Sequence, residues 1–188
     1  IATIAPEIYS HFIEHLGGVI YDGVWVGENS KIANQNGIRK SFIDTMRAVE
    51  APVLRWPGGC FADSYDWRDG IGPAAKRPAR TGFWNQQDNN RYGLHEFMHT
   101  CRAIGCKPYL AANLRTLPAR DFSQLIEYCN APAGNVPSNS AAPAVPNSLA
   151  AERAANGDPA PFNVDYWGVG NESWGCGGNL TPEEYAAM

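Results

Sequence analysis

The residues best suited to chemistry are the adjacent pair Asn171 and Glu172. They follow an apolar, strand-prone run that includes Tyr166, Trp167 and Val169, and a glycine-rich turn comes after them. A buried strand that ends in an amide and a carboxylate beside a loop is where α/β folds place catalytic groups. Such a carboxylate can act as a general acid or base if the fold brings other polar groups to it. Otherwise it is a solvated surface residue.

Three further predicted strands also end in polar side chains. The strands cover residues 8–13, 53–56 and 107–112, and the side chains are Glu14, Arg55 and Asn113. The carboxyl ends of parallel strands meet at one edge of a sheet, so we expect these side chains to lie near Glu172.

Helices separate the predicted strands. Apolar residues at helical spacing predict helices over residues 39–50, 94–104 and 119–129, and Thr181-Pro182 begins another. Long connections cover residues 60–90 and 131–161. Alternating strands and helices predict an α/β fold with a parallel sheet.

The polar strand ends favour a TIM (β/α)₈ barrel over an open doubly wound sheet, because no Gly-x-Gly-x-x-Gly turn follows the first strand. A complete barrel needs about 250 residues. Residues 1–188 are therefore expected to form its N-terminal half, about four βα units, with the later strands absent.

The composition is that of a globular domain. The net charge of -4 gives no electrostatic reason to bind nucleic acid, and no apolar run is long enough to cross a membrane. Five scattered cysteines do not form a metal-binding or disulfide pattern, so we expect reduced thiols and no cofactor.

Four stretches together resemble the GH51 α-L-arabinofuranosidases, which are retaining, barrel-fold glycoside hydrolases. They are residues 8–18 (IYSHFIEHLGG), 54–63 (LRWPGGCFAD), 69–73 (DGIGP) and 166–178 (YWGVGNESWGCGG). The resemblance keeps the same order over essentially the whole chain. The stretch around Asn171 and Glu172 is the most specific of the four.

The resemblance implies a role for each matching residue. Glu172 is similar to the general acid/base, and Asn171 to the residue that binds the sugar 2-hydroxyl. Glu14 resembles a carboxylate that binds arabinose hydroxyls. Arg55 resembles the arginine that organises the catalytic carboxylates. The remaining two substrate-binding positions are Trp84, similar to an aromatic wall of the cleft, and Cys60, where the family has Asn or Cys.

A retaining glycosidase needs a second carboxylate, about 5–5.5 Å from the first, as nucleophile. In the family this nucleophile lies on the seventh strand, and an accessory β-sandwich accompanies the barrel. Neither is expected here, so the 188-residue chain is expected to be inactive alone. The implied partner is an arabinofuranosyl oligosaccharide or polysaccharide. The resemblance also favours a cytoplasmic location over secretion and is compatible with a homo-oligomeric parent enzyme.

One alternative is a zinc peptidase, because residues 95–99 read His-Glu-Phe-Met-His, an H-E-x-x-H motif on a predicted helix. The longer form of the motif fails at Arg102 and Gly105, and a barrel places this helix outside the strand tips. Zinc would also need a third protein ligand.

A non-catalytic carbohydrate-binding module is a second alternative, given six tryptophans. Individual residues have plainer interpretations too. Arg55 and Glu14 could form a structural ion pair, Trp84 could belong to the core, and Cys60 could be a packed thiol. The flanking Trp167 and Trp174 could give Glu172 the apolar surroundings that an acid with a raised pKa requires.

Overall fold

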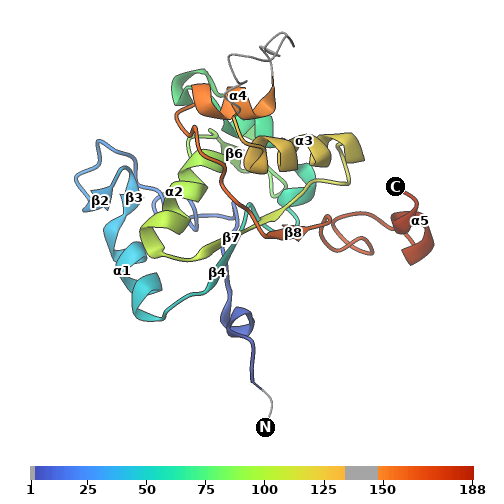
Figure 1. The fold of residues 1–188 in the computed structure, drawn as a ribbon, viewed down its shortest axis with the longest axis horizontal. Helices are drawn as coiled ribbons and strands as arrows, with labels where there is room; N and C mark the ends of the chain where they lie inside the picture. Colours follow the sequence, from blue (N-terminus) through green and yellow to red (C-terminus); the bar gives the residue numbers. More distant parts are fainter. Residues whose placement is uncertain (1–2, 134–147) are drawn as a thin grey trace, which may run out of the picture.

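A computed structural model describes residues 3–133 and 148–188 of the chain and shows an α/β domain built on one four-stranded sheet (Figure 1). The strand order is β1 (His11–Phe12), β4 (Val53–Trp56), β7 (Lys107–Ala111) and β8 (Tyr166–Gly168). All three strand pairs are parallel, as the alternation of strands and helices predicted.

The main predicted helices are confirmed as α1 (Lys40–Ala48), α2 (Leu94–Ile104) and α3 (Ala119–Asn130). Helix α2 ends where Gly105 adopts the left-handed conformation, with φ of 91°, which glycine accepts without steric cost. The predicted helix start is also confirmed, because the Thr181 side chain accepts a hydrogen bond from the Glu184 N–H and begins α5 (Pro182–Ala186). Within the described residues no helix has the length and apolarity needed to cross a bilayer.

The secondary structure differs from the sequence prediction in two places. The strand predicted over residues 8–13 is mostly wrong, since Pro6–Tyr9 form a 3₁₀ helix (η1) and Ile8 is exposed. Helix α4 (Leu149–Ala155) lies in the excursion of residues 131–161 and was not predicted; residues 134–147 of that excursion lie outside the described residues.

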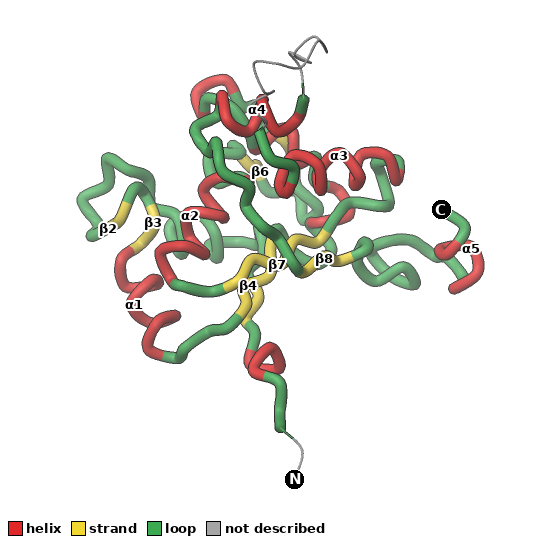
Figure 2. Tube along the Cα trace, viewed as in Figure 1, coloured by secondary structure: helices red, strands yellow, loops and turns green. Residues whose placement is uncertain are grey.

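The long connections hold short elements (Figure 2). These are the hairpin of β2 (Asn34–Gln35) and β3 (Ile38–Arg39), the 3₁₀ helices η2 (Ala62–Ser64), η3 (Trp67–Gly70) and η4 (Ala74–Lys76), and the hairpin of β5 (Arg80–Thr81) and β6 (Gln87–Asp88).

The two faces of the sheet differ in burial. Leu54, Trp56 and Leu110 are almost completely buried, and Trp56 stacks on Phe97 of α2 at 5.2 Å. The opposite face carries a row of partly or fully exposed side chains that are adjacent in the strand register: Phe12, Arg55, Tyr109 and Tyr166. In Figures 1 and 2 the N-terminal segment and α5 project away from the body that α2, α3 and α4 form with the sheet.

Candidate active site

Glu172 lies in the loop after β8, at the carboxyl edge of the parallel sheet. Its φ of 39° is in the left-handed region, which a residue with a side chain rarely adopts. The loop holds this conformation through hydrogen bonds from the Gly175 and Gly177 N–H groups to the Glu172 carbonyl, at 2.8 and 3.1 Å. The side chain is exposed, so its carboxylate is accessible to a ligand.

Arg55 connects the tips of β4 and β8. Its Nη2 donates to Asn171 Oδ1 at 2.8 Å, and its guanidinium carbon lies 4.9 Å from the Phe12 ring centre and 5.6 Å from that of Tyr109. These contacts fix the arginine on the face of the sheet opposite the helices. Its buried Nε has no hydrogen-bond partner among the described residues.

Glu14 reaches the same edge from β1. Its Oε1 accepts hydrogen bonds from the N–H groups of Gly59 (2.6 Å) and Phe61 (3.2 Å). A Cβ at Gly58 would fall 2.6 Å from Glu14 Cγ, so only glycine lets this carboxylate lie against the turn. The alternative that Glu14 and Arg55 form a structural ion pair is wrong within the described residues, because Glu14 accepts hydrogen bonds from backbone amides instead.

Asp63 is a central site residue that sequence reasoning did not select. It is 1% exposed, its Oδ2 accepts the Asn171 N–H (2.9 Å), and its Oδ1 accepts the Leu114 N–H (3.2 Å). One carboxylate thus links the loops that follow β4, β7 and β8. The only signal in the sequence was its place at the end of the family-like stretch 54–63, 108 residues before Asn171.

Replacing Asp63 by asparagine is expected to cost about 2 kcal/mol of unfolding free energy at pH 7, because one of two buried N–H groups loses its acceptor. Burial raises the pKa of Asp63 despite the hydrogen bonds from Leu114 and Asn171. A folded-state pKa above the unfolded value means that the wild type gains stability from this group as the pH falls from 7 toward 4. The difference between wild type and variant, measured by urea unfolding, should therefore grow over that range.

The matched control for Asp63 is Asp44→Asn, which removes a carboxylate from an exposed i,i+4 pair with Lys40 and should change stability by less than about 0.5 kcal/mol. An equal loss in both variants would contradict the role assigned to Asp63.

Asn113 also lies at this edge but supports its own loop. Its Nδ2 donates to the Tyr65 carbonyl and to Thr116 Oγ1, and its Oδ1 accepts the N–H groups of Arg115 and Thr116. Its amide is fully occupied by these contacts.

Cys60 does not carry the free thiol that the sequence predicted. It forms a disulfide with Cys176, which connects the loops after β4 and β8 across 116 residues of sequence. The prediction of reduced thiols is wrong for this pair, because the parallel sheet brings the β4 and β8 tips together on either side of β7. Cys101, Cys106 and Cys129 are free.

Trp84 lies at the turn of the β5–β6 hairpin and is 39% exposed, so its assignment to the core is wrong. The hairpin is anchored to the tip of β1, since Gln86 Nε2 donates to the His15 carbonyl at 2.7 Å and Gln86 Oε1 accepts the Trp84 N–H. The Trp84 indole therefore lies on a loop that is hydrogen-bonded to His15, the residue after Glu14.

His15, at the tip of β1, makes two side-chain hydrogen bonds in the buried core. Trp56 Nε1–H donates to its Nε2 at 2.9 Å, which leaves the Nδ1 proton for Asp88 Oδ2 at 2.5 Å. The ring stacks on Phe61 with centroids 4.5 Å apart. This buried network fixes the backbone that carries Glu14.

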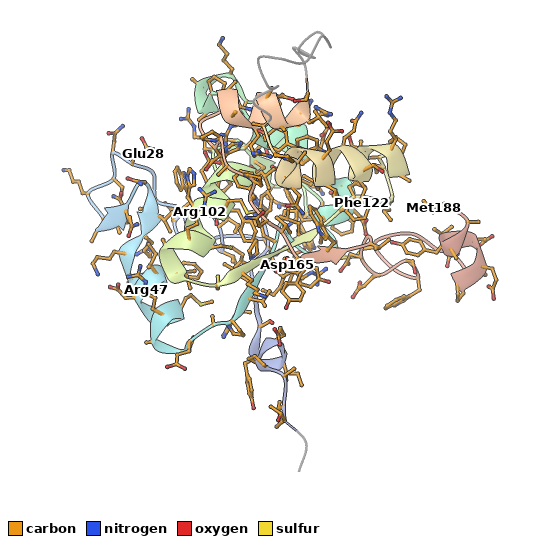
Figure 3. All side chains as sticks on the ribbon, viewed as in Figure 1. Glu28, Arg47, Arg102, Phe122, Asp165 and Met188 are labelled. Carbon is orange, nitrogen blue, oxygen red and sulfur yellow. A yellow bond between two sulfur atoms is a disulfide. The ribbon has the colours of Figure 1, made fainter. Side chains whose placement is uncertain are left out.

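The described residues do not give Glu172 the apolar surroundings that Trp167 and Trp174 could have supplied. Trp174 is 75% exposed. Trp167 contacts Phe122 of α3 (labelled in Figure 3), with ring centroids 5.7 Å apart, and donates its Nε1–H to the Val164 carbonyl. Alternation along β8 places the Trp167 side chain on the helix face, away from the loop of Glu172.

The residues of the H-E-x-x-H motif have partners within the protein. Asp158 Oδ2 bonds His95 Nδ1 (2.7 Å) and His99 Nε2 (3.0 Å), and Tyr128 bonds His95 Nε2. Glu96 pairs with Arg77 and caps α2 at the Gly93 N–H. The motif therefore forms a packing cluster outside the sheet edge, and nothing in its geometry favours the zinc peptidase.

The chain is similar to known arabinofuranosidases in sequence and in fold. The model of the alpha-L-arabinofuranosidase 1 domain matches residues 45–187. An intracellular exo-alpha-L-arabinofuranosidase of Bacteroides ovatus is 42% identical over 98% of this chain, and the chain spans 34% of that protein.

Solved structures give the same result. The GH51 arabinofuranosidase of Xanthomonas axonopodis pv. citri superimposes with a TM-score of 0.89 and 45% identity, over 99% of this chain and 36% of that one. The Thermotoga maritima alpha-L-arabinofuranosidase in complex with arabinose gives a TM-score of 0.83 and 39% identity, over 95% and 35% of the two chains.

The chain therefore spans about a third of the length of the relatives it matches. The match to the family model covers most of these residues, and the sheet that positions Glu172 is shared with the solved relatives. The chain belongs to the GH51 α-L-arabinofuranosidase family.

Proposed function

We propose that these residues belong to an enzyme that hydrolyses terminal, non-reducing α-L-arabinofuranosides of oligosaccharides or polysaccharides with retention, and that Glu172 is its acid/base. The observation that carries the proposal is the cluster at the carboxyl edge of the sheet. There Arg55 bonds Asn171, Glu14 bonds Gly59, and Glu172 extends from the adjoining loop into solvent.

In this proposal the cluster binds one arabinofuranosyl ring. Glu172 protonates the departing oxygen and later activates water. Asn171, held by Arg55 and Asp63, donates to the 2-hydroxyl, and Glu14 accepts from other hydroxyls. Trp84 forms an aromatic wall of the cleft. Cys60 contributes its sulfur surface, since its thiol is oxidised.

The second carboxylate of the mechanism is proposed to come from the remainder of a longer parent enzyme. The four parallel strands would be strands 1–4 of a (β/α)₈ barrel, so that residues 1–188 form a partial barrel. The row of partly or fully exposed side chains Phe12, Arg55, Tyr109 and Tyr166 supports this, because such a barrel would enclose that face of the sheet. A carboxylate there would pair with Arg55 beside Asn171 and Glu172.

The test compares the parent enzyme with the 188-residue chain on an aryl α-L-arabinofuranoside, with the aryl β-D-xylopyranoside as the control sugar. We expect turnover of the arabinofuranoside by the parent, none by the chain alone, and an α-configured first product by NMR, because two displacements restore the configuration. A β-configured product, real turnover by the chain alone, or binding without hydrolysis by the parent would each overturn the proposal.

A further inference from the structure

The Cys60–Cys176 disulfide lies directly beside the proposed acid/base. Cys176 Sγ is 3.3 Å from Glu172 Oε2, and one donor atom from each of Cys60, Cys176 and Glu172 lies within 4.8 Å of the other two. No other group of three such residues in the described part of the chain has this geometry. Two sulfurs and a carboxylate oxygen are a ligand set that Zn²⁺ accepts.

We propose that reduction of this disulfide creates a binding site for a thiophilic divalent cation of the zinc class. A dithiol reductant would supply two electrons and two protons, so that the Cys60–Cys176 bond breaks and the reductant becomes a disulfide. The metal then displaces the two thiol protons and forms two metal–sulfur bonds. Glu172 provides the third ligand, and water completes the tetrahedron.

The surrounding structure retains the site after reduction. The Glu172–Gly177 loop is closed by its own backbone hydrogen bonds, and Asp63 holds its start through the Asn171 N–H. In tetrahedral coordination the two sulfurs would separate to about 3.8 Å, given metal–sulfur bonds of about 2.3 Å, which side-chain rotation can supply. Asn171 Nδ2 lies 3.4 Å from Cys176 Sγ, so its N–H can stabilise the thiolate.

The functional consequence rests on the proposed role of Glu172. A carboxylate bound to a metal cannot protonate a leaving group, so the reduced, metal-loaded parent enzyme would be inactive. The disulfide form, which offers no thiolate, would be insensitive to the same metal.

The binding test needs no hydrolysis and uses the whole 188-residue chain, either oxidised or reduced with a phosphine that is then removed. Zn²⁺ is titrated against a chromophoric chelator, and Co²⁺ reports thiolate ligation by its charge-transfer absorption. We expect one Zn²⁺ per reduced chain. The oxidised chain should bind Zn²⁺ at least about a hundredfold more weakly, because losing a metal ligand lowers the affinity more than losing a residue that only supports a ligand, which costs 10–100-fold.

Variants identify the ligands. Cys60→Ser and Cys176→Ser should each lose at least about a hundredfold in Zn²⁺ affinity. Glu172→Gln should lose less, about tenfold, because the amide oxygen of Gln can still contact the metal, and it should retain the cobalt–thiolate absorption. Cys101→Ser and His99→Ala are the matched controls and should bind Zn²⁺ as the wild type does. Circular dichroism identifies any variant that fails to fold. For such a position the ligand is tested in the reduced wild type instead, where bound Zn²⁺ should protect Cys60 and Cys176 from alkylation.

Equal Zn²⁺ affinity of the oxidised and reduced chains would overturn the site, as would unchanged affinity in Cys60→Ser or loss of binding in His99→Ala. Inhibition is measured separately on the reduced and oxidised parent enzyme. A parent that binds Zn²⁺ on reduction but never hydrolyses arabinofuranosides would refute the proposed function and leave the metal site intact. A hydrolytic parent that binds no Zn²⁺ would do the reverse.

Discussion

Replacing Glu172 by alanine in the parent enzyme is expected to lower kcat/KM for arabinofuranosides with poor leaving groups by about 10⁴-fold, the upper end of what general acid–base catalysis contributes. An aryl arabinofuranoside with a strongly activated phenolate needs no protonation, so formation of the glycosyl-enzyme intermediate should be slowed far less. Hydrolysis of that intermediate by water should still be slow, because in the proposed mechanism Glu172 is also the base of the second step. The measurement is the ratio of kcat/KM between the two substrate types in wild type and variant.

Azide provides a second readout for the Glu172→Ala variant. As an anion that needs no general base, it should restore turnover of the activated substrate and give a glycosyl azide. Glu183→Ala is the control, because Glu183 is an exposed residue in the first turn of α5 and its rates should not change. An equal loss on activated and poor leaving groups would exclude Glu172 as the acid/base and indicate a binding role.

Replacing Asp158 by asparagine is expected to cost about 3 kcal/mol of unfolding free energy, because one buried carboxylate bonds three side chains and a neutral amide cannot replace all of these charge-assisted hydrogen bonds. Asp158 is 6% exposed and bonds His95, His99 and Arg102, which is labelled in Figure 3. The loss corresponds to a fall in Tm of roughly 6–12 °C for a protein of this size. The control is Asp165→Asn, whose partner Lys107 is more than half exposed and whose loss should cost under about 1 kcal/mol.

The effect at Asp158 should depend on pH. Burial acts to raise the pKa of Asp158, but hydrogen bonds from His95, His99 and Arg102 outweigh it and hold the pKa well below its usual range. A depressed folded-state pKa gives stability that is present above the unfolded value of about 3.9 and is lost as the pH falls below it. The difference between wild type and Asp158→Asn, measured by urea unfolding, should be constant from pH 7 to 5 and shrink below pH 4. A constant difference at pH 3 would contradict this account.

Local pattern was sufficient for helices α1, α2 and α3 and for the order of the four sheet strands along the chain. Apolar residues at helical spacing gave α2 its bounds, because Leu94, Phe97, Met98 and Cys101 must share one face to be buried. The strand predicted over residues 8–13 was too long. Pro6–Tyr9 form a 3₁₀ helix, and Ile8 is exposed there although it is apolar. Helix α4 is rich in alanine and has no strong apolar stripe, so its sequence gave no periodic signal.

Strand-end position was also sufficient to select Glu14, Arg55, Asn171 and Glu172, because a parallel sheet brings the carboxyl ends of its strands to one edge. Their contacts could not be predicted. Side-chain direction depends on the turn after each strand, so Arg55 bonds Asn171, whereas Glu14 turns to the backbone of Gly59.

The sequence by itself determined the family, the alternation of strands and helices, and the residue types available at the sheet edge. Only the tertiary structure decided which of them meet. Cys60 pairs with Cys176, Asp63 binds Asn171, and the two histidines of the H-E-x-x-H motif pack against Asp158. These partners are 59–116 residues apart, and no local pattern encodes such pairings. They arise because a buried polar group must be hydrogen-bonded, and the strand order decides which groups lie within hydrogen-bonding distance of one another.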